Sequence, residues 1–162
     1  MDLVIADRGE SSVITSIMDE DDVRAALRHP LVGVGTDSGA QAEDGKLSES
    51  KSHPRAWGSF PRILGRYVRE QHLLTLEEAI RKMTSKAASR VHLIDRGILR
   101  PGMLADVTIF DPASIRDVSD FGDPKHYSVG VRHVLVNGRR VVSDGVITSE
   151  RPGRPLHGPG TK

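Results

Sequence analysis

The spacing of apolar residues changes along the chain and predicts two structural parts followed by a tail. In residues 1–95 most apolar positions recur every three or four residues, as in helices with one buried face. In residues 96–150 short apolar runs alternate with turn residues, which is typical of strands. Gly97 and Pro101-Gly102 stand where the spacing changes, and we place the boundary there. Residues 151–162 are rich in proline and glycine and are expected to form a tail.

Helix starts in the first part can be located from capping residues and prolines. Asp19 precedes a run of acidic residues and can cap a helix that ends near His29-Pro30. Pro61 suits a first-turn position, so we expect a second helix to open at Phe60-Pro61. Thr75 and Glu78 have the spacing of a capping box and predict a third helix. The first part should therefore be mainly helical.

Strand-like runs occur in both parts. Residues 31–36 are apolar on both alternating faces apart from their glycines, which favours a strand covered on both sides by helices. In the second part we expect strands at residues 105–110, 131–136 and 139–142. Asn137-Gly138 should join the last two, because this pair supplies the positive φ angles of a type I′ turn. The expected fold class is α/β with a small β-domain after the helices.

Asp37 is the first candidate for chemistry, because it follows a predicted strand and precedes a polar loop at residues 38–52. Strand ends and the loops after them carry the catalytic groups of β/α barrels. The loop, at roughly a dozen residues, is longer than most connections, which suggests a functional role. An Asx-turn or a helix-capping aspartate explains the same position. The position alone leaves both interpretations of Asp37 open.

The His53-Pro54-Arg55 run after this loop is the second candidate. The planar fork of an arginine such as Arg55 suits two-point binding of a carboxylate. Trp57 could form the floor of a pocket, or it could anchor the loop to the core beside a solvated arginine. The sequence position does not decide between these interpretations.

The remaining histidines show no pattern of a metal site. They form no His-x-His pair, no Glu-x-x-His and no pair at i,i+4 spacing, so a self-contained metal site is not predicted. These residues are His29, His72, His92, His126, His133 and His157.

Charge and hydropathy exclude several classes of partner. The net charge is +1, from 23 basic and 22 acidic residues, so no long-range field attracts nucleic acid or an anionic membrane. Arg62, Arg66 and Arg69 share a helical face, which we expect to be solvated. No apolar stretch approaches the ~20 residues that span a bilayer. The chain has no cysteine, which excludes disulfides within it. We expect a cytoplasmic protein that binds neither nucleic acid nor membranes.

Several blocks of sequence, in the same order, resemble the N-acyl-D-amino-acid deacylase (D-aminoacylase) family of amidohydrolases. The most specific are GVGTDS at residues 33–38 and HPRAWGSFPRILGRYVRE at residues 53–70. LEEAIRKMTS at 76–85 continues the resemblance. DRG at 95–97, PGMLAD at 101–106 and VLVNG at 134–138 are similar to amidohydrolases in general.

The resemblance implies a fold, a substrate class and a cofactor. The fold is a (β/α)8 barrel followed by a small β-domain, a composite β-sandwich. Residues 1–95 would supply the last barrel strand with its flanking helices, and residues 96–150 the β-domain. The reaction is hydrolysis of an N-acyl-D-amino acid to a carboxylate and a D-amino acid, with zinc as the cofactor.

The resemblance also assigns roles to individual residues. It implies that Asp37 is a metal ligand and the general base toward the metal-bound water, and that it then passes the proton to the leaving amine. It implies that Arg55 holds the α-carboxylate of the substrate. His53 and Ser38 are carried to the substrate-binding side as well, although the family usually has glycine where this chain has Ser38.

One departure from the family is the lack of the other zinc ligands. The family's amino-terminal His-x-His and its middle-strand ligands have no counterpart here, and a barrel of this type needs ~250 residues. We therefore expect a carboxyl-terminal portion, a fragment that by itself binds no catalytic zinc and shows no turnover. Two alternatives stay open: another amidohydrolase, such as a dihydroorotase or cyclic-amide hydrolase, and a non-catalytic remnant or partner subunit that associates through open barrel and sheet edges.

Overall fold

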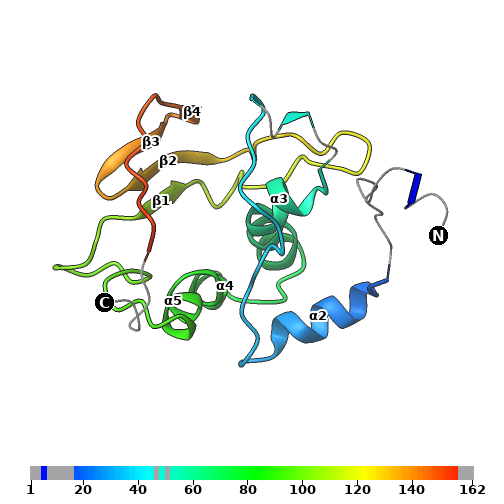
Figure 1. Cartoon of the computed structure of the whole chain (residues 1–162). Helices are drawn as coiled ribbons and strands as arrows, with labels where there is room; N and C mark the ends of the chain where they lie inside the picture. Colours follow the sequence, from blue (N-terminus) through cyan, green and yellow to red (C-terminus); the bar gives the residue numbers. More distant parts are fainter. Residues whose placement is uncertain (1–4, 7–16, 46–47, 50–51, 157–162) are drawn as a thin grey trace.

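The computed structural model describes residues 5–6, 17–45, 48–49 and 52–156, arranged as in Figure 1. The helices are α2 (Glu20–Arg28), α3 (Arg55–Arg62), η2 (Ile63–Glu70), α4 (Leu76–Met83) and α5 (Ser85–Arg90). The strands are β1 (Val107–Phe110), β2 (Val131–Val136), β3 (Arg139–Ser143) and β4 (Val146–Ile147). Among these elements every helix precedes every strand along the chain, as the apolar spacing predicted.

Side-chain caps define the starts of α2 and α4, as the sequence predicted. The Asp19 carboxylate accepts a hydrogen bond from the N–H of Asp21 at 2.7 Å. Thr75 Oγ1 accepts one from the N–H of Glu78 at 3.2 Å. Each bond satisfies an N–H group that the first turn leaves without a helical partner, and such a cap is worth ~1 kcal/mol. Helix α2 ends at its C-cap His29, also as predicted.

The helix that carries Arg55 begins earlier than predicted. The expected start at Phe60-Pro61 is wrong, because Pro54 is the N-cap and Pro61 lies in the last turn of α3. A proline inside a helix removes one i→i−4 hydrogen bond. The helix continues directly after it as η2, a π-helix in which the bonds span one more residue. The earlier start places Arg55 in the first turn of α3.

The strand predicted at residues 31–36 is not formed. The described chain there is irregular, and its backbone bond to α4 is a single long one, from Val34 N–H to the Lys82 carbonyl at 3.4 Å. A strand needs a neighbouring strand to pair its N–H and C=O groups. The one sheet among the described residues pairs β1 to β4 with each other. The expected cover on both sides is also not seen, because positions 31, 33 and 35 are exposed and positions 32, 34 and 36 are half-buried. The apolar pattern predicted a covered strand without showing whether a partner strand lies beside it.

The second part forms a four-stranded antiparallel sheet in the order β1-β2-β3-β4. Asn137 and Gly138 join β2 to β3 with φ angles of 48° and 76°. Both angles are positive, as the predicted type I′ turn requires. The predicted hairpin is therefore confirmed.

A buried cluster connects the helices to the long segment between β1 and β2. Ile115 of this segment is 2% exposed, and its carbonyl accepts a hydrogen bond from Arg69 Nη1 at 2.6 Å. Gly65 lies against the same carbonyl, where a Cβ atom would come within 2.8 Å of the oxygen. Figure 1 shows the segment, drawn in yellow, passing close to α3. The cluster consists of Leu27, Ile63, Leu64, Tyr67, Ala79 and Ile115.

The arginines expected to form a solvated face are bound to other elements instead. Arg62 pairs with Asp117 at 2.9 Å and Arg66 with Glu20 at 3.2 Å. Arg69 binds the Ile115 carbonyl described above. A helical repeat of arginines shows which face they share, but not the acceptors that tertiary folding brings to that face.

Three sequence predictions fall partly outside the described residues. The tail at residues 151–162 is described as far as residue 156, without helix or strand. The loop at residues 38–52 is described except for residues 46–47 and 50–51. His157 lies outside the described residues.

Candidate active site

Asp37 presents its carboxylate to solvent from a special backbone conformation. Its φ angle is 48°, and its side chain is 89% exposed. Aspartate and asparagine adopt this left-handed conformation more readily than other side chains do. The next residue, Ser38, is half-buried, and its carbonyl accepts a hydrogen bond from Thr36 Oγ1 at 3.4 Å. The turn therefore directs the carboxylate of Asp37 outward.

Arg55 meets Asp37 across the space between α3 and the irregular segment before the loop. Arg55 Nη1 lies 3.1 Å from Asp37 Oδ2, and the arginine side chain is 45% exposed. The sequence analysis identified the two as separate candidate functional residues, Asp37 from a predicted strand end and Arg55 from the run after the loop. It did not predict that they pair. The structure thus brings together an exposed carboxylate and a guanidinium that can bind an anion.

His53 organises the start of α3. Its Nδ1 accepts a hydrogen bond from the N–H of Arg55 at 3.0 Å, and its ring lies edge-on to Phe121 at 5.1 Å. Burial, and then the positive charge of Arg55, lower the pKa of His53 below its usual value of 6.5. The neutral imidazole is thereby favoured, and only the neutral ring can accept the hydrogen bond at Nδ1.

Trp57 anchors the end of the loop. Its Nε1–H donates to Oγ of the buried Ser52 at 3.0 Å. Its ring packs edge-on against Tyr127 at 5.2 Å. This geometry favours the anchoring interpretation of Trp57 over a pocket floor, because both its polar and apolar parts are engaged by the protein.

The segment at residues 117–127 supports α3, and the sequence reasoning missed it. Asp117, with 17% of its side chain exposed, pairs with Arg62. Burial alone would lower the pKa of Arg62, but the hydrogen bond and charge of Asp117 raise it above its usual value. Gly58 faces the same aspartate, and a Cβ there would lie 2.8 Å from Asp117 Cβ. The glycine inside a helix was the one local sign of this close contact.

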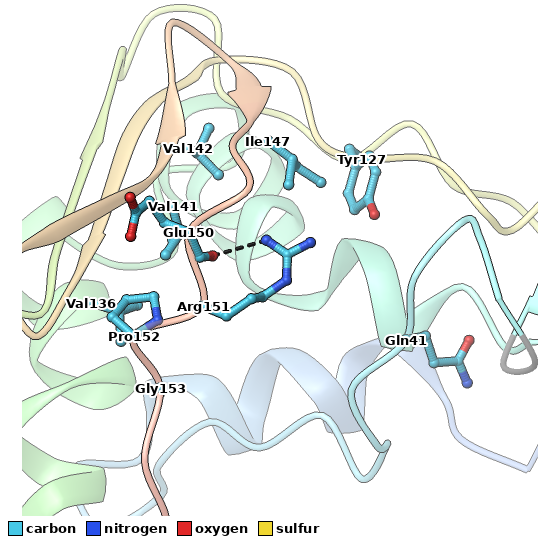
Figure 2. A pocket seen from close by; sticks show the side chains of 10 residues that line it. All are labelled: Gln41, Tyr127, Val136, Val141, Val142, Ile147, Glu150, Arg151, Pro152 and Gly153. Carbon is cyan, nitrogen blue, oxygen red and sulfur yellow. Dashed lines mark hydrogen bonds between the residues drawn. The ribbon is translucent and has the colours of Figure 1, made fainter.

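A cavity of about 350 Å³ lies between one face of the sheet and the chain that follows β4 (Figure 2). Val136, Val141 and Ile147 line it, and across from them Arg151 Nη1 donates to the Glu150 carbonyl at 2.9 Å. The predicted site residues do not line this cavity. Its mainly apolar walls offer little for acid–base chemistry, so we do not include it in the site.

A complete zinc site is not present in the part of the chain that the structure describes. No three His, Cys, Asp or Glu side chains gather there as metal ligands would. Asp37 brings one carboxylate, and its neighbour Arg55 is itself a cation. A catalytic zinc needs about three protein ligands. The described residues therefore do not fit a zinc ion by themselves.

Comparison with known proteins identifies the family of this chain. The chain belongs to the amidohydrolase family, whose family model matches residues 5–142.

Within this family the similar relatives are deacylases. The chain is 42% identical over 152 residues to the N-acyl-D-aspartate deacylase of Alcaligenes xylosoxydans xylosoxydans, covering 94% of this chain and 29% of the relative. It is 45% identical over 139 residues to the N-acyl-D-glutamate deacylase of the same organism, covering 86% and 27%. The resemblance found in the sequence is thus confirmed. The chain spans less than a third of the length of these relatives.

A solved structure of the same kind shows the fold. The N-acyl-D-glutamate deacylase from Bordetella bronchiseptica, complexed with zinc and a phosphonate mimic of the tetrahedral intermediate, has a TM-score of 0.69 at 44% identity. The match covers 79% of this chain and 26% of that chain. The described residues therefore have the fold of part of an amidohydrolase.

Proposed function

We propose that this chain is the part of an N-acyl-D-amino-acid deacylase that supplies the proton-transfer carboxylate and the binding group for the substrate's α-carboxylate. The observation that carries the proposal is the pairing of Asp37 with Arg55 at 3.1 Å, in a chain of the amidohydrolase family. The names of the relatives support the substrate class, because they are deacylases of N-acyl-D-aspartate and N-acyl-D-glutamate.

In this proposal Asp37 is the general base and then the general acid. Its carboxylate takes a proton from the attacking water as the oxygen bonds to the amide carbon, and gives the proton to the amide nitrogen as the C–N bond breaks. The products are a carboxylate and a free D-amino acid. The 89% exposure of Asp37 supports this role, because among the described residues the carboxylate remains open to water and substrate apart from its contact with Arg55.

Arg55 is the proposed recognition group. Its guanidinium can form two parallel hydrogen bonds to a carboxylate, which places an α-carboxylate and its amide bond in a defined orientation. An incoming substrate would replace Asp37 on Arg55 and leave the base free for proton transfer. His53, which accepts the N–H of Arg55, is proposed to orient this residue, and Ser38 to border the substrate beside the base.

We also propose that the chain takes its place in a (β/α)8 barrel with residues 1–95, a small β-domain with residues 96–150 and a tail at 151–162. The similarity to solved deacylases supports this arrangement. Residues 31–36 would there pair with strands that the described residues do not contain. Zinc is the metal we propose, because a solved relative contains it. Its remaining ligands would come from outside the described residues, so we assign no step of this chain to the metal.

A chimera tests the proposal. In it, this whole chain replaces the matching portion of the Alcaligenes N-acyl-D-aspartate deacylase. The chimera should release D-amino acid from N-acetyl-D-aspartate or N-acetyl-D-glutamate, and not from the L-isomers. Asp37→Asn should reduce kcat by ~10²–10⁴-fold. Arg55→Met should mainly raise KM, and Asp22→Asn, on the exposed start of α2, serves as the matched control.

Several outcomes would contradict the proposal. A folded chimera without turnover, or one that is fully active with Asp37→Asn, would remove its basis. Hydrolysis of dihydroorotate in place of N-acyl-D-amino acids would favour the alternative amidohydrolase. For the isolated chain we predict no turnover; zinc bound at one equivalent together with deacylation of N-acetyl-D-methionine would refute that prediction.

Association and location remain predictions. Strand β1 lies at the edge of the sheet, and an unpaired edge can add a strand from another chain. Size-exclusion chromatography and a denaturant titration test this. A monomer in the first that unfolds cooperatively in the second would count against association. Among the described residues, no helix combines the length and the apolar character needed to cross a bilayer. A cytoplasmic location is an expectation that cell fractionation can check.

A further inference from the structure

Lys82 of α4 is completely buried although its side chain is charged. It has 0% exposure, and its ammonium group donates to the His29 carbonyl at 2.6 Å and to the Val32 carbonyl at 2.8 Å. A carboxylate oxygen of Glu78 lies 3.7 Å from the same nitrogen. Lysine is almost never fully buried unless it is paired, so this placement requires a specific set of acceptors.

The ammonium group of Lys82 has two hydrogen-bond acceptors and a nearby counter-charge. The group has three N–H donors, and burying such a charge without partners is costly. Here two carbonyl oxygens and a carboxylate surround it. Both carbonyls belong to the turn that follows α2, at His29 and Val32. The lysine therefore holds one turn of backbone in place and does more than bring two side chains together.

The turn held by Lys82 leads directly to Asp37. The N–H of Val34 bonds to the backbone carbonyl of Lys82, and Lys86 of α5 donates to the Pro30 carbonyl. Since residues 31–36 are not paired in a sheet, these bonds from α4 and α5 fix the path of the segment. Asp37 lies between this anchored turn and its ion-pair partner Arg55 on α3.

We propose that Lys82 is a positioning residue for Asp37. By holding the two carbonyls it sets the direction in which residues 33–37 leave α2, and so the position at which the carboxylate meets Arg55. In this proposal Lys82 acts on Asp37 through the backbone and not through a direct contact. The inference rests on the function proposed above for Asp37, but its test uses a structural signal that does not need turnover.

The ¹⁵N resonances of the Arg55 guanidinium in the full chain provide this signal, because they respond to pairing with a carboxylate. Asp37→Asn defines the resonances of the unpaired state. Lys82→Met removes the charge and keeps an unbranched side chain. We expect Lys82→Met to shift the Arg55 resonances more than half of the way from their wild-type positions to their positions in Asp37→Asn. Arg90→Met, which removes an exposed cation at the end of α5, is the matched control and should leave the Arg55 resonances within a quarter of that shift.

A second variant covers the case in which Lys82→Met does not fold. Lys82→Arg keeps a cation that can donate to both carbonyls, but the guanidinium is larger than the ammonium and should displace the turn, giving an intermediate shift. Unchanged Arg55 resonances in every folded Lys82 variant, even with lowered thermal stability, would overturn the inference and leave Lys82 a purely stabilising residue. If the resonances shift but the chimera has no deacylase activity, the proposed function fails and the positioning role stands.

Discussion

Two aspartate–arginine pairs of this protein differ in exposure, and this difference predicts that the same substitution destabilises the fold to different extents. Asp37 is 89% exposed beside Arg55, whereas Asp117 is 17% exposed beside Arg62. Asp→Asn removes the charge and preserves the shape in each case. We expect Asp37→Asn to leave the free energy of unfolding almost unchanged, and Asp117→Asn to lower it clearly.

The magnitudes follow from the surroundings of each carboxylate. An exposed ion pair contributes about 0.2–1 kcal/mol. Asparagine also tolerates the positive φ of residue 37, so Asp37→Asn adds no backbone strain. A hydrogen bond to a charged group contributes about 1.5–3 kcal/mol, and we expect the lower end for Asp117 because Arg62 remains partly solvated. Asp37→Asn should thus cost less than about 1 kcal/mol, and Asp117→Asn about 1.5 kcal/mol.

Urea unfolding followed by circular dichroism measures both values. With a slope of about 1–3 kcal/mol/M, a loss of 1.5 kcal/mol lowers the midpoint by roughly 0.5–1.5 M, and a loss of 0.5 kcal/mol by less than about 0.5 M. Repeating the measurement in 1 M salt should remove most of the small effect of Asp37→Asn, because the screening length falls to about 3 Å. A loss above 2 kcal/mol for Asp37→Asn would refute the reasoning, since Asp37 would then stabilise the fold and would not be free for chemistry.

Three further predictions concern the structure around the site. Ile115→Ala should lower the free energy of unfolding by about 2–5 kcal/mol in a denaturant titration, because it leaves a cavity in the buried cluster. A loss below 1 kcal/mol would show that this cluster does not join the two parts. Gly58→Ala should destabilise by about 1–3 kcal/mol, because its Cβ would lie 2.8 Å from a side-chain atom. Gly39→Ala is the matched control and should not destabilise, because a Cβ there meets nothing within 4 Å among the described residues beyond its chain neighbours. Equal midpoints for the two glycine variants would contradict the close contact. The hydrogen bond from Arg81, followed by the charges of Arg81 and the neighbouring lysine, lowers the pKa of Glu78 from 4.5 to about 2. The stabilisation is therefore complete above about pH 4.5 and is lost as the pH falls toward 2. Glu78→Gln should flatten the fall of Tm across this range, and an unchanged pH profile would contradict the pairing.

Parts of the candidate site could be predicted from the sequence, and other parts could not. Asp37 and Arg55 were identified from a predicted strand end and from a motif shared with a family, while their pairing was not. The predicted strand before Asp37 was wrong, although the aspartate itself remains the candidate base. Lys82 gave no signal, because a lysine at a helical position is normally solvated. Its burial depends on the carbonyls of residues 29 and 32, which tertiary folding brings beside it from about fifty residues away in the chain.

The sequence by itself determined the features whose partners lie a few residues apart. The caps at Asp19 and Thr75 and the turn at Asn137-Gly138 formed as predicted, because each depends on backbone groups within three residues or on the local φ angles. The tertiary structure decided that residues 31–36 are irregular and do not form a strand, and that Asp37 pairs with Arg55. Both depend on groups distant in the chain, and a local pattern shows which groups need partners without showing where those partners lie.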